Sequence, residues 1–337
     1  MKLIFLQFIQ NGEFEKIVNK NINLKSLYPK SYDEYNKIKK LLISLRILLF
    51  KNNIYKKYVK NNYDVEIAFL EGPITNIISS KNKKTKKIAW IHTDLSSTHE
   101  NAFKFKIKKI INKKIYKKYN NLIFVSKQNL NEFNKIYNIE NNKQVIHNYL
   151  NIENVLLKSK EYTANLPKDN IPNFVTVARL VEAKALDRLI TVHYKLIKEG
   201  YNHRFFVVGD GPLKSKLEEL IVKLKLKESF ILCGQKENPY PYILDADFFC
   251  LLSYTEGLPM TLLESKILNK YIIITDNSSK EALEDYENKK IVENSEDGIY
   301  NGLKEIIENY PNIKIIETSS NDENNEIINK IKNLLGD

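Results

Sequence analysis

The chain has 337 residues, of which 43% are hydrophobic and 28% are charged, a balance typical of a folded globular protein. This length exceeds that of one ordinary domain, so we expect two domains with a core each. The composition excludes a disordered chain. The longest apolar block, residues 41–50, has about half of the roughly 20 residues that cross a membrane, so we expect no transmembrane helix. The first residues read as a strand rather than a signal peptide.

Charge is distributed unevenly along the chain. Residues 1–150 contain 29 Lys and Arg against 11 Asp and Glu, whereas residues 151–337 contain 24 against 30. A basic half and an acidic half are expected to face different partners. The two cysteines, Cys233 and Cys250, lie in apolar stretches. This placement indicates buried thiols rather than a disulfide, and it favours a cytoplasmic protein.

Apolar runs separated by helical patterns predict five strands in the first half. These runs are residues 2–8, 65–71, 87–92, 121–126 and 143–148. A polar, proline-containing stretch at 151–172 is the predicted linker between a first domain, 1–150, and a second domain, 173–337.

A basic segment at 104–119 combines eight lysines with apolar residues at helical spacing. Two interpretations remain open: an amphipathic helix on an anionic membrane, and a lysine-rich helix packed on its own domain. A nucleic acid would also suit such a surface, but no recognised nucleic-acid-binding module accompanies it. We therefore expect no nucleic-acid partner.

Strands and helices alternate regularly in the second half. This alternation is typical of parallel βαβ units, and six strands are enough for a doubly wound sheet. The predicted strands are 174–178, 204–209, 229–234, 247–253, 271–275 and 289–293, and the longer helices between them are 186–199, 213–226 and 259–269.

The sharpest motif is LLSYTEGLPMTLLES at 251–265, where an apolar strand leads through a loop into a helix. Pro259 suits a first helical turn, and Gly257 permits close approach of the backbone. Free amides at such a helix start, together with the helix dipole, predict an anion site. Glu256 before the helix and Glu264 within it could hold hydroxyl groups on either side of a bound diphosphate. The alternative is an ordinary helix start with a solvated Glu264.

A second motif, VARLVEAKALDRLI at 177–190, places two cations just after a predicted strand. Arg179 provides a planar fork and Lys184 a point charge, and together they could neutralise a leaving diphosphate. Solvated surface side chains are the alternative, because exposed Arg and Lys are common.

The four segments 177–190, 205–220, 230–238 and 251–265 together resemble retaining glycosyltransferases of family 4, which have the GT-B architecture of two Rossmann-like domains facing across a cleft. The resemblance implies transfer of a hexose or N-acetylhexosamine from a nucleotide diphosphate sugar, a UDP-sugar above all, to a growing surface glycan such as capsule or lipopolysaccharide, with a lipid-linked acceptor. It also implies an enzyme at the inner face of the cell membrane that needs no metal or cofactor. The literal Asp245-Ala246-Asp247 pattern is therefore not expected to bind a metal.

The resemblance also assigns roles to individual residues. His92, at the end of KKIAWIHTDLSS (86–97), corresponds to a histidine that reaches the donor sugar, although a lone histidine at a strand end is often structural. The remaining roles are catalysis by Glu256, Arg179 and Lys184, and donor binding by Arg179, Lys184, Gly257, Leu258, Pro259, Met260, Thr261, Glu264 and Gln235.

Three departures from the family pattern accompany the resemblance. The nucleotide loop offers Gln235, Lys236 and Glu237, which do not identify the base. A glycine commonly follows the lysine in relatives, whereas this chain has Ala185. The first half also lacks the usual glycine-rich loop, so we expect the first βα unit to be missing. Two alternatives therefore stay open: a degenerate protein that binds nucleotide sugars without catalysis, and a GT-B sugar-nucleotide epimerase.

Overall fold

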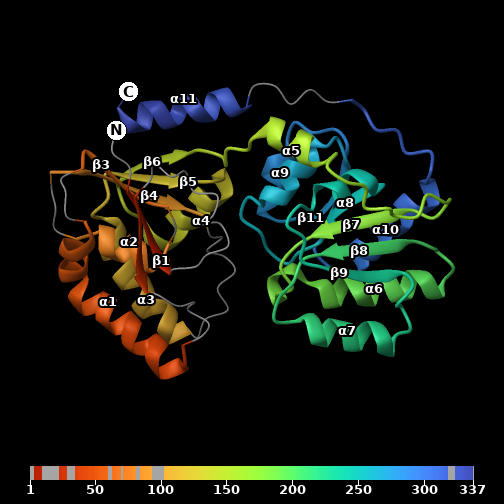
Figure 1. Cartoon of the computed structure of the whole chain (residues 1–337), viewed down its shortest axis with the longest axis horizontal. Coiled ribbons are helices and arrows are strands. Elements are labelled where there is room, and N and C mark those ends of the chain that lie inside the picture. The colour runs from red at the N-terminus through yellow and green to blue at the C-terminus, as the bar shows by residue number, and fades with distance from the viewer. Residues whose placement is uncertain are drawn as a thin grey trace. The chain divides into compact units, whose positions relative to one another are not determined.

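The computed structural model describes residues 4–9, 23–28, 35–59, 63–69, 71–80, 84–92, 102–317 and 323–336. The chain divides into two compact units, Met1–Ile146 and His147–Asp337, and each has a parallel sheet covered by helices (Figure 1). The predicted pair of parallel α/β domains is confirmed. None of the described helices is long and apolar enough to cross a membrane.

The first unit contains a four-stranded parallel sheet in the order β3-β4-β5-β6 and a separate parallel pair, β1-β2. The five predicted strands are present. Strand β2 was not predicted, because its sequence NLKSLY contains only three apolar or aromatic side chains. The strands are β1 (Ile4–Ile9), β2 (Asn23–Tyr28), β3 (Val65–Ala68), β4 (Lys86–Ile91), β5 (Asn121–Phe124) and β6 (Asn142–Val145), and the helices are α1 (Lys37–Tyr58), α2 (Pro73–Ile78), α3 (Ala102–Tyr116) and α4 (Lys127–Tyr137).

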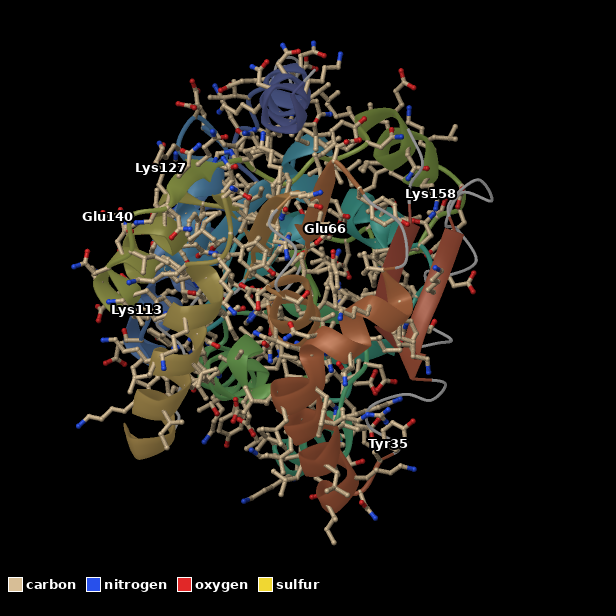
Figure 2. The ribbon with its side chains drawn as sticks, turned by 90° about the vertical axis from the view of Figure 1, so that its left-hand side faces the viewer. Tyr35, Glu66, Lys113, Lys127, Glu140 and Lys158 are labelled. Carbon is tan, nitrogen blue, oxygen red and sulfur yellow. The ribbon has the colours of Figure 1, made fainter. Side chains whose placement is uncertain are left out.

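A buried ion pair lies beside the sheet of the first unit. The Nζ atom of Lys87 lies 3.7 Å from Oε2 of Glu66, which is labelled in Figure 2, and donates to the carbonyls of Ile78 and Ser80 at 2.6 Å each. Burial lowers the pKa of Lys87, and the Glu66 carboxylate opposes this shift. These bonds connect β3 and β4 to the end of α2, so the pair fixes the helix on the sheet.

The second unit contains a six-stranded parallel sheet in the order β12-β11-β10-β7-β8-β9. Helix α6 packs against α7 and α10, whereas α5 packs against α8 and α9; Figure 1 shows α6 and α7 together along the sheet. The strands are β7 (Asn173–Val177), β8 (Arg204–Val208), β9 (Phe230–Gly234), β10 (Phe248–Leu251), β11 (Tyr271–Thr275) and β12 (Lys289–Val292), and the helices are α5 (Ile152–Lys158), α6 (Leu186–Lys198), α7 (Lys214–Lys223), α8 (Tyr240–Asp245), α9 (Met260–Ile267), α10 (Glu296–Asn309) and α11 (Glu323–Leu335), with 3₁₀ turns η4 (Glu182–Lys184) and η5 (Ser278–Leu283).

Helix α5 lies inside the segment that was expected to be a linker. Its first turn is capped by Asn151, whose side chain accepts from the backbone N–H of Asn154, and Val155 is buried. Its seven residues are too few to show a helical period in the sequence.

The strand order of the second unit places its centre between β7 and β10. The chain leaves β7 through β8 and β9 on one side, then returns to β10 and continues through β11 and β12 on the other. Parallel α/β sheets bind ligands beyond the carboxyl ends of the strands at the point where the order reverses. In this sheet the loops after β7 and β10 flank that point, and they contain the two predicted motifs.

Candidate functional site

The two motifs meet through an ion pair at the centre of the second unit. The Nζ atom of Lys184 donates to Oε1 of Glu256 at 2.6 Å, and the two side chains are 19% and 9% exposed. The backbone N–H of Tyr254 also donates to the carbonyl of Ala183 at 3.0 Å, which ties the loop after β10 to η4. The structure therefore brings together two residues that are 72 positions apart in the sequence.

The backbone at Ala185 takes a conformation that favours glycine, the residue that the family resemblance led us to expect at this position. Ala185 has φ 51° and ψ 34°, in the left-handed region, and it lies between η4 and the start of α6. An L-residue in this conformation costs about 1–2 kcal/mol. The Ala185 side chain is fully buried, and its backbone N–H donates to the carbonyl of Glu182 at 3.0 Å. The tight turn that presents Lys184 is thus kept without the glycine.

Arg179 is exposed in the loop after β7. The backbone of this loop is hydrogen-bonded to the loop after β8. The N–H of Leu180 donates to the carbonyl of Asp210 at 3.0 Å, and the carbonyl of Leu180 accepts from Leu213 at 3.1 Å. A Cβ atom on Gly211 would lie 2.6 Å from the Leu180 oxygen, so only glycine permits this approach. The loop after β8 therefore sets the position of the Arg179 backbone.

The helix start after Glu256 has the features of an anion site. Pro259 is the N-cap residue of α9 and provides no side-chain hydrogen bond, and the first turn contains no acidic residue. The N–H groups at this start are therefore not capped by the Pro259 side chain. Leu258 is buried, and its carbonyl accepts from the Asn148 side chain at 3.2 Å. The Ser278 hydroxyl donates to the carbonyl of Glu256. The other predicted donor-binding residues of this segment are Gly257, Met260 and Thr261, all partly exposed.

Glu264 is buried in α9 rather than solvated, which contradicts the alternative interpretation of its position. The residue is 9% exposed, and its carboxylate accepts from the hydroxyl of Tyr240 at 3.1 Å. Burial raises the pKa of Glu264, and the Tyr240 hydrogen bond opposes this rise. Burial also raises the pKa of Tyr240, which remains a hydrogen-bond donor. Tyr240 was missed by sequence reasoning, because nothing in NPYPYIL indicates which tyrosine faces α9.

Arg188 is a second residue that sequence reasoning missed. Its side chain is buried, and Nη2 donates to the carbonyl of Leu252 at 2.9 Å, while its guanidinium lies 4.2 Å from the centre of the Tyr254 ring. Burial lowers the pKa of Arg188, and the Tyr254 hydroxyl opposes this shift. Arg188 lies on α6 and reaches under the loop after β10, so it supports the backbone that leads to Glu256. The sequence feature that could have identified Arg188 is its place in the second motif, four residues after Lys184.

Gln235 follows β9 at the carboxyl edge of the same sheet and is exposed. Gly234 before it has φ 71°, and its carbonyl accepts from the N–H of Gly209 at 2.9 Å. Gln235 is thus two strands further from the centre than the Arg179 loop, because β8 lies between β7 and β9.

His92 follows β4 in the first unit. Burial lowers its pKa, against the opposing effects of the Glu71 carboxylate and a hydrogen bond to the backbone of Phe69. Its backbone N–H donates to the Glu71 carboxylate at 2.8 Å. Within the described part of the chain, no group hydrogen-bonds to the buried Nε2 atom. The ring is therefore neutral near pH 7 and can accept a hydrogen bond at Nε2. Residues 93–97 of the predicted segment lie outside the described residues.

The other histidines have structural partners. His193 and His203 are buried and share a hydrogen bond of 2.8 Å between Nδ1 and Nε2. The other ring nitrogens contact the hydroxyl of Ser229 and the carbonyl of Tyr201, at 2.8 Å each. His147 contacts Glu281 at 3.2 Å. His99 lies outside the described residues.

The two aspartates of the Asp-Ala-Asp pattern also bind protein groups. Asp245 accepts from the backbone N–H of Asn165 at 3.1 Å, and Asp247 accepts from that of Asn173 at 2.8 Å. The first bond attaches the segment before β7 to the end of α8, and the second attaches the first residue of β7 to the residue before β10.

Comparison with known proteins identifies the family. The model of glycosyl transferases group 1 matches residues 158–331, more than half of the chain. An uncharacterised glycosyltransferase of Methanocaldococcus jannaschii is 29% identical over 225 residues, covering 65% of this chain and 55% of the relative. A 4-alpha-N-acetylgalactosaminyltransferase of Campylobacter jejuni, named for a diphospho-undecaprenol-linked substrate, is 29% identical over 257 residues, covering 74% and 68%. The chain thus spans between about half and two thirds of these relatives.

The fold is also similar to that of a solved glycosyltransferase structure. HepE of Anabaena, crystallised with UDP and glucose, superposes with a TM-score of 0.73 at 14% identity and covers 99% of both chains. The expected GT-B fold class is therefore confirmed. On the family match, this chain belongs to the glycosyl transferases group 1 family.

Proposed function

We propose that this chain, as a member of the glycosyl transferases group 1 family, transfers a hexose or N-acetylhexosamine from a UDP-sugar to a growing surface glycan such as capsule or lipopolysaccharide. The observation that carries the proposal is the contact of Lys184 with Glu256 at the reversal point of the second sheet. The UDP in the HepE structure supports a UDP donor. The undecaprenol-linked substrate named for the Campylobacter relative supports a lipid-linked acceptor.

The charged groups of the second unit match the parts of such a donor. Arg179 and Lys184 would hold the diphosphate together with the amides at the start of α9. An ammonium group has three N–H donors, so Lys184 can keep its bond to Glu256 and also donate to a phosphate oxygen. Glu264 would accept from the ribose hydroxyls, and Gln235 would lie toward the base. In the first unit, the neutral His92 would accept from a hydroxyl of the transferred sugar.

The proposed reaction retains the anomeric configuration and needs no metal ion. As the bond from the anomeric carbon to the diphosphate breaks, negative charge grows on the leaving oxygen, and Arg179, Lys184 and the α9 amides stabilise it. The acceptor hydroxyl attacks from the same face and gives its proton to the leaving diphosphate oxygen, so that the glycoside and UDP are released. Fixed groups that stabilise growing charge usually supply the largest part of catalysis. Glu256 orients Lys184 and lies on the side of the transferred sugar.

A transfer assay tests this proposal. Purified protein is incubated with a panel of UDP-sugars and polyprenyl-diphosphate-linked acceptors in EDTA, and the anomeric configuration of the product is read by NMR. We expect an α-linked product from an α-configured donor, and loss of turnover by about 100-fold or more in Arg179→Ala and Lys184→Ala. Unchanged turnover in both variants would refute the mechanism. Donor consumption without acceptor would indicate an epimerase or hydrolase, and donor binding without turnover a degenerate protein.

A further inference from the structure

Helix α1 of the first unit has apolar side chains on two opposite faces. One face contributes Ile43, Ile47, Ile54 and Tyr55 to a buried cluster with Leu27 and Ile77. The other face is exposed: the fractions are 71% for Ile38, 61% for Leu41, 59% for Leu42 and 69% for Leu49, with Leu45 and Leu48 also exposed. Figure 2 shows the side chains of this helix projecting from the ribbon near the labelled Tyr35.

The exposed residues form one continuous stripe. At 3.6 residues per turn, positions 38, 41, 42, 45, 48 and 49 fall within a sector of about 120°, opposite positions 43 and 47. The helix is regular over this part, because its one non-helical residue, Phe50 with φ −115° and ψ 19°, follows the stripe. An apolar stripe of this length on a soluble surface marks an interaction site.

The charges around the stripe are all of one sign. The α1 sequence contains seven Lys and Arg and no Asp or Glu. By the same helical geometry, Lys39 and Arg46 border the stripe on one side. Lys51 is different, because its Nζ atom donates to Asn76 and Ser79 of the α2 region at 3.0 and 2.9 Å. Basic side chains beside an apolar stripe can extend toward anionic headgroups while the stripe enters the acyl region.

A hollow of about 450 Å³ lies on the Arg46 side of the helix. Arg46 and Lys57 line it together with Ile47, Phe50 and Tyr58. Two cations over an apolar and aromatic wall suit the phosphate and glycerol of a lipid headgroup. The hollow therefore adds a place for an anionic lipid next to the stripe.

We propose that the exposed stripe of α1 binds the surface of an anionic lipid bilayer, with the helix lying in the plane of the interface. A second copy of the chain is the less suitable occupant, because residues 1–150 carry a net charge of +18 and two such surfaces repel. An anionic bilayer instead gains from both the charge and the apolar area.

The proposal assigns the membrane surface to α1 rather than to the segment 104–119. The structure places Ile115, Tyr116 and Tyr119 in the core of the first unit, so much of the apolar face of that segment packs on its own domain. Ile107 and Ile110 remain exposed. Bilayer binding by α1 requires no nucleotide sugar, so it can fail without affecting the proposed transfer reaction.

Sedimentation with lipid vesicles tests the proposal on the full chain. We expect binding to vesicles of phosphatidylglycerol and phosphatidylcholine, and binding weaker by about tenfold or more to phosphatidylcholine alone. The double variant Leu42→Gln/Leu49→Gln should lower binding to the anionic vesicles by about tenfold or more. Lys39→Gln/Arg46→Gln should lower it and reduce its dependence on salt.

A matched control replaces apolar residues that are equally exposed but lie in the second unit. Leu157→Gln/Val222→Gln, at positions 71% and 52% exposed, should bind vesicles like the wild type. Circular dichroism establishes that each variant is folded. Equal vesicle binding by the wild type and the α1 double variant would overturn the proposal. The proposal would also be overturned if the wild type does not bind vesicles but forms a dimer in light scattering, and the α1 double variant is monomeric.

Discussion

The buried histidine pair of the second unit predicts a specific loss of stability in mild acid. Burial lowers the pKa of His193 to about 2 and that of His203 to about 4, from an ordinary value of 6.5. The folded state therefore leaves both rings neutral, whereas the unfolded chain binds protons below pH 6.5. The contribution of the two neutral rings to the stability of the folded state is fully present above that pH, and it is lost as the pH falls toward the folded pKa values.

The magnitude follows from these pKa values. When the pH falls from 7.5 to 5, proton binding to the unfolded chain lowers the free energy of unfolding by about 2 kcal/mol for each ring, or about 4 kcal/mol for the pair. Urea unfolding of the second unit, followed by far-UV circular dichroism at both pH values, measures this loss. Trp90, the single tryptophan, reports on the first unit and separates the two transitions.

A double variant isolates the contribution of the pair. His193→Leu/His203→Leu removes both titrating rings from a site that is already surrounded by aromatic rings, those of Phe174, Phe205 and Phe230. We expect lower stability at pH 7.5 and a drop between pH 7.5 and 5 that is smaller than the wild-type drop by about 4 kcal/mol. An equal drop in the double variant and the wild type would show that the two buried histidines do not cause the loss of stability in acid.

Two further substitutions probe the candidate donor site. Tyr240→Phe removes the hydrogen bond that opposes the raised pKa of Glu264, so the pKa of this carboxylate should rise further. We expect UDP affinity to fall about 3- to 10-fold. As the pH is lowered, the affinity of the variant should begin to decline at a higher pH than that of the wild type, which calorimetry at pH 5 to 8 measures. Gly211→Ala places a Cβ 2.6 Å from the Leu180 oxygen, and we expect a loss of about 1–3 kcal/mol in stability with weaker UDP binding; unchanged urea unfolding and affinity would contradict the role of this contact.

The sequence predicted the fold of the second unit well because its strands are covered on both faces. Runs such as FFVV and YIII are uniformly apolar, and helical patterns of regular length separate them. This alternation leads to a parallel doubly wound sheet, and the sheet brings the ends of β7 and β10 together. The proximity of Lys184 and Glu256 could therefore be expected from topology before any distance was known.

Other features depend on tertiary contacts that leave no pattern in the sequence. The hydrogen bond of Tyr240 to Glu264 and the reach of Arg188 to Leu252 each depend on how one helix packs against its neighbour. Ala185 takes a left-handed conformation that its residue type disfavours, because the buried turn around it determines the backbone. Helix α1 is apolar on two faces, so its period gave no indication of which face is exposed.

Calorimetric titration of UDP into the full chain tests whether the second unit binds the nucleotide of a sugar donor between the ends of β7 and β10. We expect binding by the wild type and affinity lower by about tenfold or more in Lys184→Ala and in Glu264→Gln, whereas Lys223→Ala, which changes an exposed lysine at the end of α7, should bind like the wild type. Equal affinity in all four proteins, or no binding by a folded wild type, would contradict a donor site at this position.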